Sequence, residues 1–254
     1  MSNVECRISN VEFSILKKFM NIPDRITALD WDKAATGLDD IGYAVLPNVL
    51  KPAECDDLVN QYADDALYRK TVIMERHQYG KGAYKYFKYP LPPLIQQLRE
   101  SVYPKLVPVM NGWMEKLNMP GRFPDSLAEQ LELCHANDQL KPTPLILKYE
   151  KGGFNALHQD LYGDVFFPVQ LVIFLDEASR DYEGGEFVLI EQRPRAQSKA
   201  IVLKPRKGDM LVFTTNFRPV KGTRGYHRVN MRHGVSEITE GGRHTLGIIF
   251  HDAK

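Results

Sequence analysis

The sequence predicts a mainly β protein of the α+β class, in which a β barrel or jelly roll carries helices on one side. Three observations lead to this prediction. Segments with helical spacing of apolar residues lie in the first part of the chain, before residue 138. From Pro144 onward the pattern changes to about eight short strand-like segments at close spacing. Glycine-rich or polar turns separate these segments, and no linker divides the chain.

The composition is that of an ordinary globular protein. The chain has 254 residues, of which 43% are hydrophobic and 26% charged, and its formal net charge is +1. So small a net charge gives no overall attraction to nucleic acid or membrane, and any electrostatic surface must be local. The three cysteines, Cys6, Cys55 and Cys134, form no Cys-x-x-Cys pair, which favours a reducing compartment. Without a membrane-span or secretory pattern, we expect a cytoplasmic protein, or a nuclear one in a eukaryote.

The first part of the chain is predicted to be mainly helical. Residues 1–28 are assigned to an N-terminal extension that packs on the domain, where Pro23 is expected to end a short helix. Residues 29–254 are assigned to a single domain. A short strand is predicted at 42–47. The predicted helices are 30–40, 52–62, 94–117 with interruptions at Pro104 and Pro108, and 126–137, which opens with a capping box at Ser126 and Glu129.

Residues 76–92 interleave lysines with aromatic residues, among them Tyr84 and Tyr86. This mixture suits a surface that contacts phosphates with cations and stacks bases on rings. It equally suits an edge strand with aromatic side chains inward and lysines in water. The sequence leaves both interpretations open.

The strands of the second part are bounded by recognisable turns. One of them is Glu240-Gly241-Gly242, which we expect to join two strands as a hairpin. The predicted strands are 145–150, a segment around 158–160, 169–175, 186–191, 200–204, 210–215, 229–236 and 245–250.

His158 and Asp160 stand two residues apart in one of these segments. Side chains repeat every second residue on a strand, so both point the same way. A second histidine from another strand would complete two imidazoles and one carboxylate on one face of a metal. This arrangement is the facial triad of non-haem Fe(II) oxygenases, which leaves positions open for a co-substrate and oxygen.

Four later histidines are candidates for the second imidazole: His227, His233, His244 and His251. His233 fits best because Arg243 follows it on the strand after the expected turn. The distal carboxylate of 2-oxoglutarate needs a cation there, and arginine offers a fixed two-pronged donor. The same offset from His227 reaches Glu237, which would repel that carboxylate.

Two more residues are predicted to touch the co-substrate. Thr245 shares a strand face with Arg243, so its hydroxyl can add a hydrogen bond. Tyr149 lies on the strand before the turn that leads to His158, and its phenol can reach the same molecule; a half-buried packing tyrosine is the equal alternative.

These motifs together resemble the Fe(II)/2-oxoglutarate dioxygenase superfamily over about residues 142–252. The residues that carry the likeness are Tyr149, His158-Gln159-Asp160, Gly184-Gly185-Glu186-Phe187, Gly208-Asp209, and His233-Gly234 with Arg243. Residues 84–87, 158–163, 184–189 and 244–251 further resemble a bacterial-type oxygenase family named for acting on nucleic acid, related to oxidative demethylases of the AlkB kind. The spacing from His233 to Arg243 is more similar to prolyl-hydroxylase-type members.

The resemblance implies a double-stranded β-helix core of the jelly-roll or cupin-like kind. It implies iron at His158, Asp160 and His233, with Arg243 on 2-oxoglutarate. The expected reaction consumes O₂ and releases succinate and CO₂, with ascorbate supportive in vitro. Oxidation of an alkylated nucleic-acid base, a DNA-repair demethylation, is the first expectation. Hydroxylation of a protein side chain or small metabolite is the alternative, and a metal-free sensing barrel is a third.

The candidate substrate residues lie in three places. Residues 216–232 form the most basic stretch, in which Arg224 and Arg228 are candidates for phosphate contact. A solvated loop whose arginines pair with acids is the ordinary alternative. Tyr162 follows the metal motif and is a candidate wall of the substrate pocket. Tyr84 and Tyr86, from the segment of lysines and aromatic residues, are candidates to stack on a substrate base.

Overall fold

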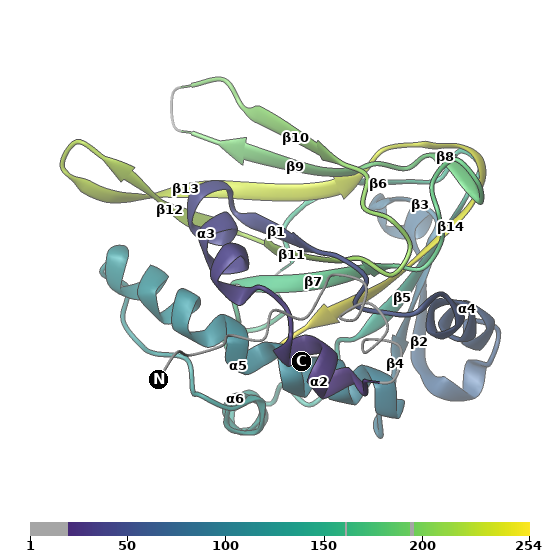
Figure 1. The fold of residues 1–254 in the computed structure, drawn as a ribbon, viewed down its shortest axis with the longest axis horizontal. Helices are drawn as coiled ribbons and strands as arrows, with labels where there is room; N and C mark the ends of the chain where they lie inside the picture. The colour runs from purple at the N-terminus through teal and green to yellow at the C-terminus, as the bar shows by residue number, and fades with distance from the viewer. Residues whose placement is uncertain (1–19, 161, 194–195) are drawn as a thin grey trace, which may run out of the picture.

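The computed structural model describes residues 20–160, 162–193 and 196–254. Two antiparallel sheets face each other (Figure 1), as the jelly-roll prediction requires. The larger sheet has the order β1 (Tyr43–Leu46), β11 (Met210–Thr214), β7 (Val169–Phe174), β14 (Ile238–Ile249), β5 (Leu145–Glu150), β4 (Ala83–Phe87), β2 (Tyr68–Ile73), with β8 (Tyr182–Gly184) beside β14. The smaller sheet has the order β10 (Lys199–Leu203), β9 (Phe187–Gln192), β13 (Gly225–Val235), β6 (Phe154–His158), β3 (Gly80–Lys81), with β12 (Phe217–Gly222) beside β13.

Burial along the strands follows their place in the two layers. All six residues of β7 are buried, because the smaller sheet covers one face and helices cover the other. On β9 buried and half-buried residues alternate, because its outer face meets solvent.

The helices pack on the outer face of the larger sheet (Figure 1). They are α2 (Ile22–Thr27), α3 (Trp31–Ile41), α4 (Pro52–Gln61), α5 (Pro93–Lys116) and α6 (Leu127–His135), with 3₁₀ turns at Asp65–Leu67 and Met74–His77. The capping box of α6 is present, since the Glu129 N–H donates to Ser126 Oγ and the Ser126 N–H to Glu129 Oε2. Within the described residues, no helix is both long and apolar enough to cross a membrane.

Two proline predictions were wrong. α5 runs through Pro104 and Pro108 without interruption. Its apolar face, with Leu98, Val102 and Trp113, is fully buried against the sheet, and this burial outweighs the lost backbone hydrogen bonds. Pro23 is the second residue of α2 instead of the end of a helix, because proline fits the first turn, where its missing N–H costs nothing. The helix expected around residues 11–20 lies almost wholly outside the described residues.

The strands of the first part of the chain complete the sheets. β1 pairs with β11, β3 with β6, and β4 with β5. β4 therefore lies inside the larger sheet between β2 and β5, so the edge-strand interpretation was wrong for residues 83–87, whereas β3 stands at the edge of the smaller sheet.

The hairpin expected at Glu240-Gly241-Gly242 was also wrong. These residues lie inside β14, which pairs with β8 there, and the chain turns instead at Ser236 and Glu237. β13 and β14 consequently belong to different sheets, so His233 and Arg243 come from opposite layers of the sandwich instead of from neighbouring strands of a hairpin. The basic stretch at 216–232, considered as a loop, is the hairpin of β12 and β13.

Candidate metal and co-substrate site

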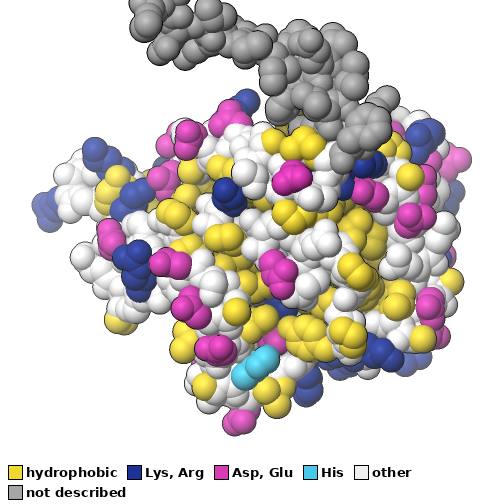
Figure 2. Space-filling view, turned by 60° about the horizontal axis from the view of Figure 1, so that its bottom comes forward, with side chains coloured by type: hydrophobic (Ala, Val, Ile, Leu, Met, Phe, Trp, Pro, Cys, Tyr) yellow, Lys and Arg dark blue, Asp and Glu magenta, His cyan; other side chains and the backbone are white. Residues whose placement is uncertain are grey.

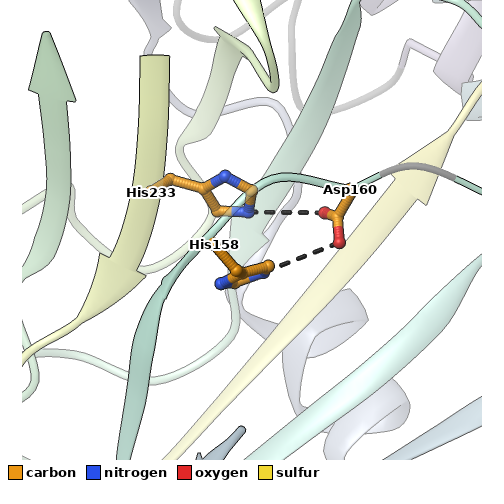
Figure 3. A group of neighbouring side chains, drawn as sticks. All are labelled: His158, Asp160 and His233. Atoms are coloured by element: carbon orange, nitrogen blue, oxygen red, sulfur yellow. Dashed lines mark ion pairs between the residues drawn. The ribbon is translucent and has the colours of Figure 1, made fainter. Parts of the chain in front are cut away.

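Three side chains meet between the two sheets at the predicted metal site (Figure 3). His158 ends β6, and its cross-strand partner on β13 is His233, so the register itself places the two imidazoles together. Asp160 follows β6 and turns its carboxylate toward both rings. The Nε2 atoms of His158 and His233 lie 3.6 Å and 3.3 Å from the two Asp160 oxygens, and the potential ligand atoms all lie within 4.8 Å of one another.

Neighbouring groups orient these three side chains. The carbonyl of Ala156 accepts a hydrogen bond from Nδ1 of His158 at 2.7 Å, so the lone pair of its Nε2 faces the site. Both oxygens of Asp160 are bound, one by the hydroxyl of Tyr162 at 2.9 Å and the other by Nε2 of Gln170 at 2.8 Å.

The protonation states of Asp160 and His233 suit the binding of a metal cation. Burial acts to raise the pKa of Asp160, but the hydrogen bond and charge of His233, with His158 beside it, hold that pKa well below its usual range. Burial and the neighbouring His158 lower the pKa of His233. Asp160 is therefore ionised and His233 neutral near pH 7, as metal ligands must be.

Arg243 lies deeper in the sandwich, opposite Tyr149 in the pairing of β14 with β5. The side chain is 1% exposed, and its guanidinium lies 5.2 Å from the ring centre of Phe174 and 5.7 Å from that of Tyr149. All three of its nitrogens are buried without a hydrogen-bond partner in the described part of the chain, as is the hydroxyl of Tyr149. Buried charges are almost always paired, so these donors indicate a site for an anionic ligand.

A family model for oxygenases matches residues 82–253, and its description reads "oxygenase, catalysing oxidative methylation of damaged DNA". The chain belongs to this oxygenase family. Two relatives, uncharacterized proteins from two strains of Mycobacterium tuberculosis, are each 44% identical over 196 residues, which covers 75% of this chain and 84% of theirs. The protein is thus an oxidoreductase.

Solved structures share the fold of this oxygenase. A Pseudomonas putida prolyl-4-hydroxylase superposes with a TM-score of 0.54 at 13% identity, over 86% of this chain and 96% of that one. A Trichoplax adhaerens prolyl hydroxylase, solved with a hypoxia-inducible-factor peptide, has a TM-score of 0.55 at 14% identity, over 91% and 93%. A 2OG-Fe(II) oxygenase-family oxidoreductase from Burkholderia pseudomallei has a TM-score of 0.50 at 16% identity, over 88% and 93%. These likenesses confirm the double-stranded β-helix.

The oxygenase has a cavity of about 450 Å³ that joins the triad to Arg243. Tyr149 and Thr245 line it together with Arg243, so the predicted co-substrate residues share one cavity with the predicted metal ligands. Tyr84, Tyr86 and Tyr162 also line it; the hydroxyl of Tyr86 donates to that of Tyr162 at 3.4 Å, and the hydroxyl of Tyr162 donates to Asp160.

The other predicted residues lie elsewhere. Arg224 and Arg228 are exposed on the β12–β13 hairpin and do not line the cavity. The rejected histidines are also outside it: His227 is exposed on the same hairpin, His244 pairs with Asp176 at 2.9 Å, and Nδ1 of His251 accepts from the Phe167 N–H at 3.1 Å.

Two residues of the site had not been predicted to act there. Gln170 bonds to Asp160 and lies 3.2 Å from Nε2 of His233. The sequence could have indicated it, because Gln170 is the only polar residue of the otherwise apolar strand Val169–Phe174. Gly185 adopts a φ of +64°, and a Cβ there would lie 2.2 Å from Ile238 Cδ1 and 3.1 Å from Arg243 Cδ. Glycine is therefore needed for the close approach of this turn to Arg243.

Proposed function

We propose that this oxygenase depends on Fe(II) and 2-oxoglutarate and oxidises an alkylated base in nucleic acid. One observation carries the cofactor assignment. A buried arginine, whose nitrogens have no hydrogen-bond partner among the described residues, lines the same cavity as two imidazoles and a carboxylate. The donor set of two nitrogens and one oxygen suits Fe(II), and the guanidinium suits the distal carboxylate of a short dicarboxylic acid.

Each residue of the site has a defined task in this proposal. His158, Asp160 and His233 would hold the metal. Arg243 would bind the distal carboxylate of 2-oxoglutarate, with hydrogen bonds from Tyr149 and Thr245. Fe(II) and 2-oxoglutarate together supply the oxidising chemistry, in which O₂ is consumed, succinate and CO₂ are released and a substrate C–H bond is hydroxylated. The apolar and tyrosine walls exclude bulk water and orient that bond.

The substrate assignment is supported by the family description and by the cavity. Tyr84 and Tyr86 place two rings on the cavity wall, and aromatic side chains are the usual stacking partners of an extruded base. Hydroxylation of an N-methyl group releases the methyl carbon as formaldehyde and leaves the unmodified base. Nucleic acid with an N-methylated base is therefore the substrate class that we propose.

The cofactor assignment is tested by succinate release with Fe(II), 2-oxoglutarate and ascorbate. Wild-type protein should release succinate, and His233→Ala should reduce release to background. His227→Ala is the matched control, because it removes an exposed histidine six positions earlier on the same strand. Equal loss in both variants, or full activity in His233→Ala, would show that the metal ligands are wrongly assigned.

The substrate assignment is tested by comparing stimulators in the same assay. Single-stranded DNA with N-methylated bases should increase succinate release and yield formaldehyde, and unmethylated DNA of the same sequence should do neither. Stimulation by a proline-containing peptide or a small metabolite, without stimulation by methylated DNA, would replace the nucleic-acid proposal with a hydroxylase.

A further inference from the structure

We infer that the outer face of β13 binds the sugar–phosphate backbone of a nucleic acid along its length. The surface consists of Tyr226, Arg228, Asn230 and Arg232, with Lys221 from β12, and we call it the β13 strip. The inference rests on the proposed function and adds a binding surface outside the catalytic cavity. No residue of the strip lines that cavity.

The first argument is charge. Between residues 215 and 236 the chain has five arginines and lysines, counted from Arg218, Lys221, Arg224, Arg228 and Arg232, and no aspartate or glutamate. Arg218 is buried and paired with Glu191. The other four form no ion pair with any residue that the structure describes. Figure 2 shows Lys and Arg side chains gathered on the lobe at the left, which is the place of this hairpin in Figure 1.

The second argument is the direction of the side chains. Val229, Met231 and His233 are buried toward the sandwich, and Arg228, Asn230 and Arg232 alternate with them and are exposed. Lys221 stands opposite Tyr226 in the register of β12 with β13, so both lie on the same outer face. At a strand rise of about 3.3 Å per residue, Arg228 and Arg232 are roughly 13 Å apart on one straight face. Such a row matches an extended polyanion better than a single phosphate group.

The third argument is that Arg228 is held in place before any ligand binds. Its guanidinium lies 4.3 Å from the ring centre of Phe217, and its Nη2 donates to Asn216 Oδ1 at 3.0 Å. Arg228 is exposed and already held by these two contacts, so less side-chain entropy is lost when it contacts a phosphate.

The side-chain amide of Asn216, which binds Arg228, also connects the strip to the metal site. Asn216 Oδ1 also accepts from Gln159 Nε2 at 3.1 Å, and Gln159 stands between His158 and Asp160 in the chain. The strip also ends at Arg232, one residue from His233 on the opposite face. A strand bound to the strip would therefore be fixed close to the segment that carries two of the proposed metal ligands.

Neighbouring strands add no negative charge to this face. On β9, Gln192 and Ile190 stand opposite Asn230 and Arg232. Tyr226 is 44% exposed, and the ammonium of Lys116, itself paired with Asp39, lies 5.6 Å from its ring centre. A row of cations with an exposed ring among them suits phosphates and a stacked base, so nucleic acid is the partner that we assign.

The test measures binding of an unmodified, fluorescently labelled 20-nucleotide oligo-dT to the full chain by anisotropy, over a salt series. Each phosphate contact contributes about 0.7 to the slope of log affinity against log salt for single strands. The double variant Arg228→Ala/Arg232→Ala loses two contacts, so the magnitude of this negative slope should fall by roughly 1.4. Arg228→Lys/Arg232→Lys keeps both charges and should retain most of the slope. Thermal unfolding checks that the variants are folded.

Arg206→Ala is the matched control, because Arg206 is exposed and lies in the turn beyond β10, at the opposite end of β13. It should leave the slope unchanged. An unchanged slope in the double alanine variant would overturn the strip as a nucleic-acid surface. So would binding of poly-glutamate to wild type as tightly as oligo-dT, if the double alanine variant abolishes that binding. DNA binding that depends on the strip, without succinate release stimulated by methylated DNA, would retain the strip and reject the proposed function.

Discussion

At the residue scale, Arg243 is a side chain whose burial opposes folding unless a ligand binds. A buried guanidinium without an anion is unfavourable; the guanidinium of Arg243 has no hydrogen-bond partner in the described structure and lies within 5.9 Å of the ring centres of Tyr149, Phe174 and Tyr182. Such a residue is retained because it serves a ligand, and stability and function therefore conflict at this position.

This conflict makes a prediction for Arg243→Met. Methionine fills a similar volume without a charge, so the variant should unfold at a higher temperature than wild type when no ligand is added. With a divalent metal present throughout, addition of 2-oxoglutarate should raise the unfolding temperature of wild type and leave that of the variant unchanged. Thermal unfolding with and without 2-oxoglutarate measures both effects. A ligand-induced rise in the variant equal to that of wild type would remove Arg243 from the co-substrate site.

Gln170 makes a second prediction at this scale. Its Nε2 holds one oxygen of Asp160, and its Oε1 is buried without a partner among the described residues. Gln170→Leu should weaken Co(II) binding by roughly 10- to 100-fold, the usual cost of losing a group that orients a metal ligand. Its stability should change little, because an incompletely bonded amide is lost.

The control for Gln170 is Gln130→Leu, which removes another buried glutamine, on α6 and outside the cavity. Absorption titration with Co(II) follows both variants. If the two bind Co(II) equally well, Gln170 has no part in orienting Asp160.

At the element scale, the sequence predicted strands better than their connections. The prediction for 145–150 coincides with β5, because alternation and flanking turns mark a strand locally. Gly241 and Gly242 were misread as a turn, because a glycine pair inside a strand has the same local signature. Here Gly241, at φ +75°, is where the backbone of β14 closely approaches Asp181 of the neighbouring chain segment. Only the pairing of β14 with β8, a long-range property, distinguishes the two cases.

The turn between β8 and β9 makes the element-scale prediction. Gly185→Ala adds a Cβ that meets Ile238 and Arg243 at a backbone conformation that alanine rarely adopts. The turn must shift, and Arg243 shifts with it, so the KM for 2-oxoglutarate should rise with a smaller change in kcat. Gly112→Ala, which has open space around its Cβ position within α5, is the control. An unchanged KM in Gly185→Ala would show that the turn does not position Arg243.

At the scale of the whole molecule, the choice of His233 rested on an incorrect picture of the fold. His233 and Arg243 were placed on neighbouring strands of a hairpin, whereas β13 and β14 lie in facing sheets. The residues nonetheless line one cavity, because a sandwich brings the inner faces of both sheets together. Strand alternation predicts which side chains point inward. It does not predict which residue such a side chain contacts in the interior, and for this reason the contacts of Gln170 and Tyr162 with Asp160 were missed.

The stability of the whole fold should depend on pH through His251. Burial, together with the nearby charge of Arg99, lowers the pKa of His251 to about 4, below the ordinary value of 6.5. The Nδ1 of the neutral ring accepts a hydrogen bond from the Phe167 N–H. Between pH 6.5 and 4 the unfolded chain therefore binds a proton that the folded chain does not. The free energy of unfolding should fall as pH decreases through this window, by about 1.4 kcal/mol per pH unit at most.

Urea unfolding in the presence of a chelator, at several values between pH 7 and pH 4, measures this effect. His251→Asn keeps an acceptor for the Phe167 N–H and cannot take up the proton, so its stability should fall less steeply than that of wild type. His227→Asn replaces an exposed histidine and should follow the wild-type curve. Parallel curves for wild type and His251→Asn would mean that another group causes the acid sensitivity of the fold.

Buried carboxylates with lowered pKa values, such as Glu191 beside Arg218, lose their stabilising contribution only below the ordinary carboxyl pKa of 4.5, so the two windows are separable.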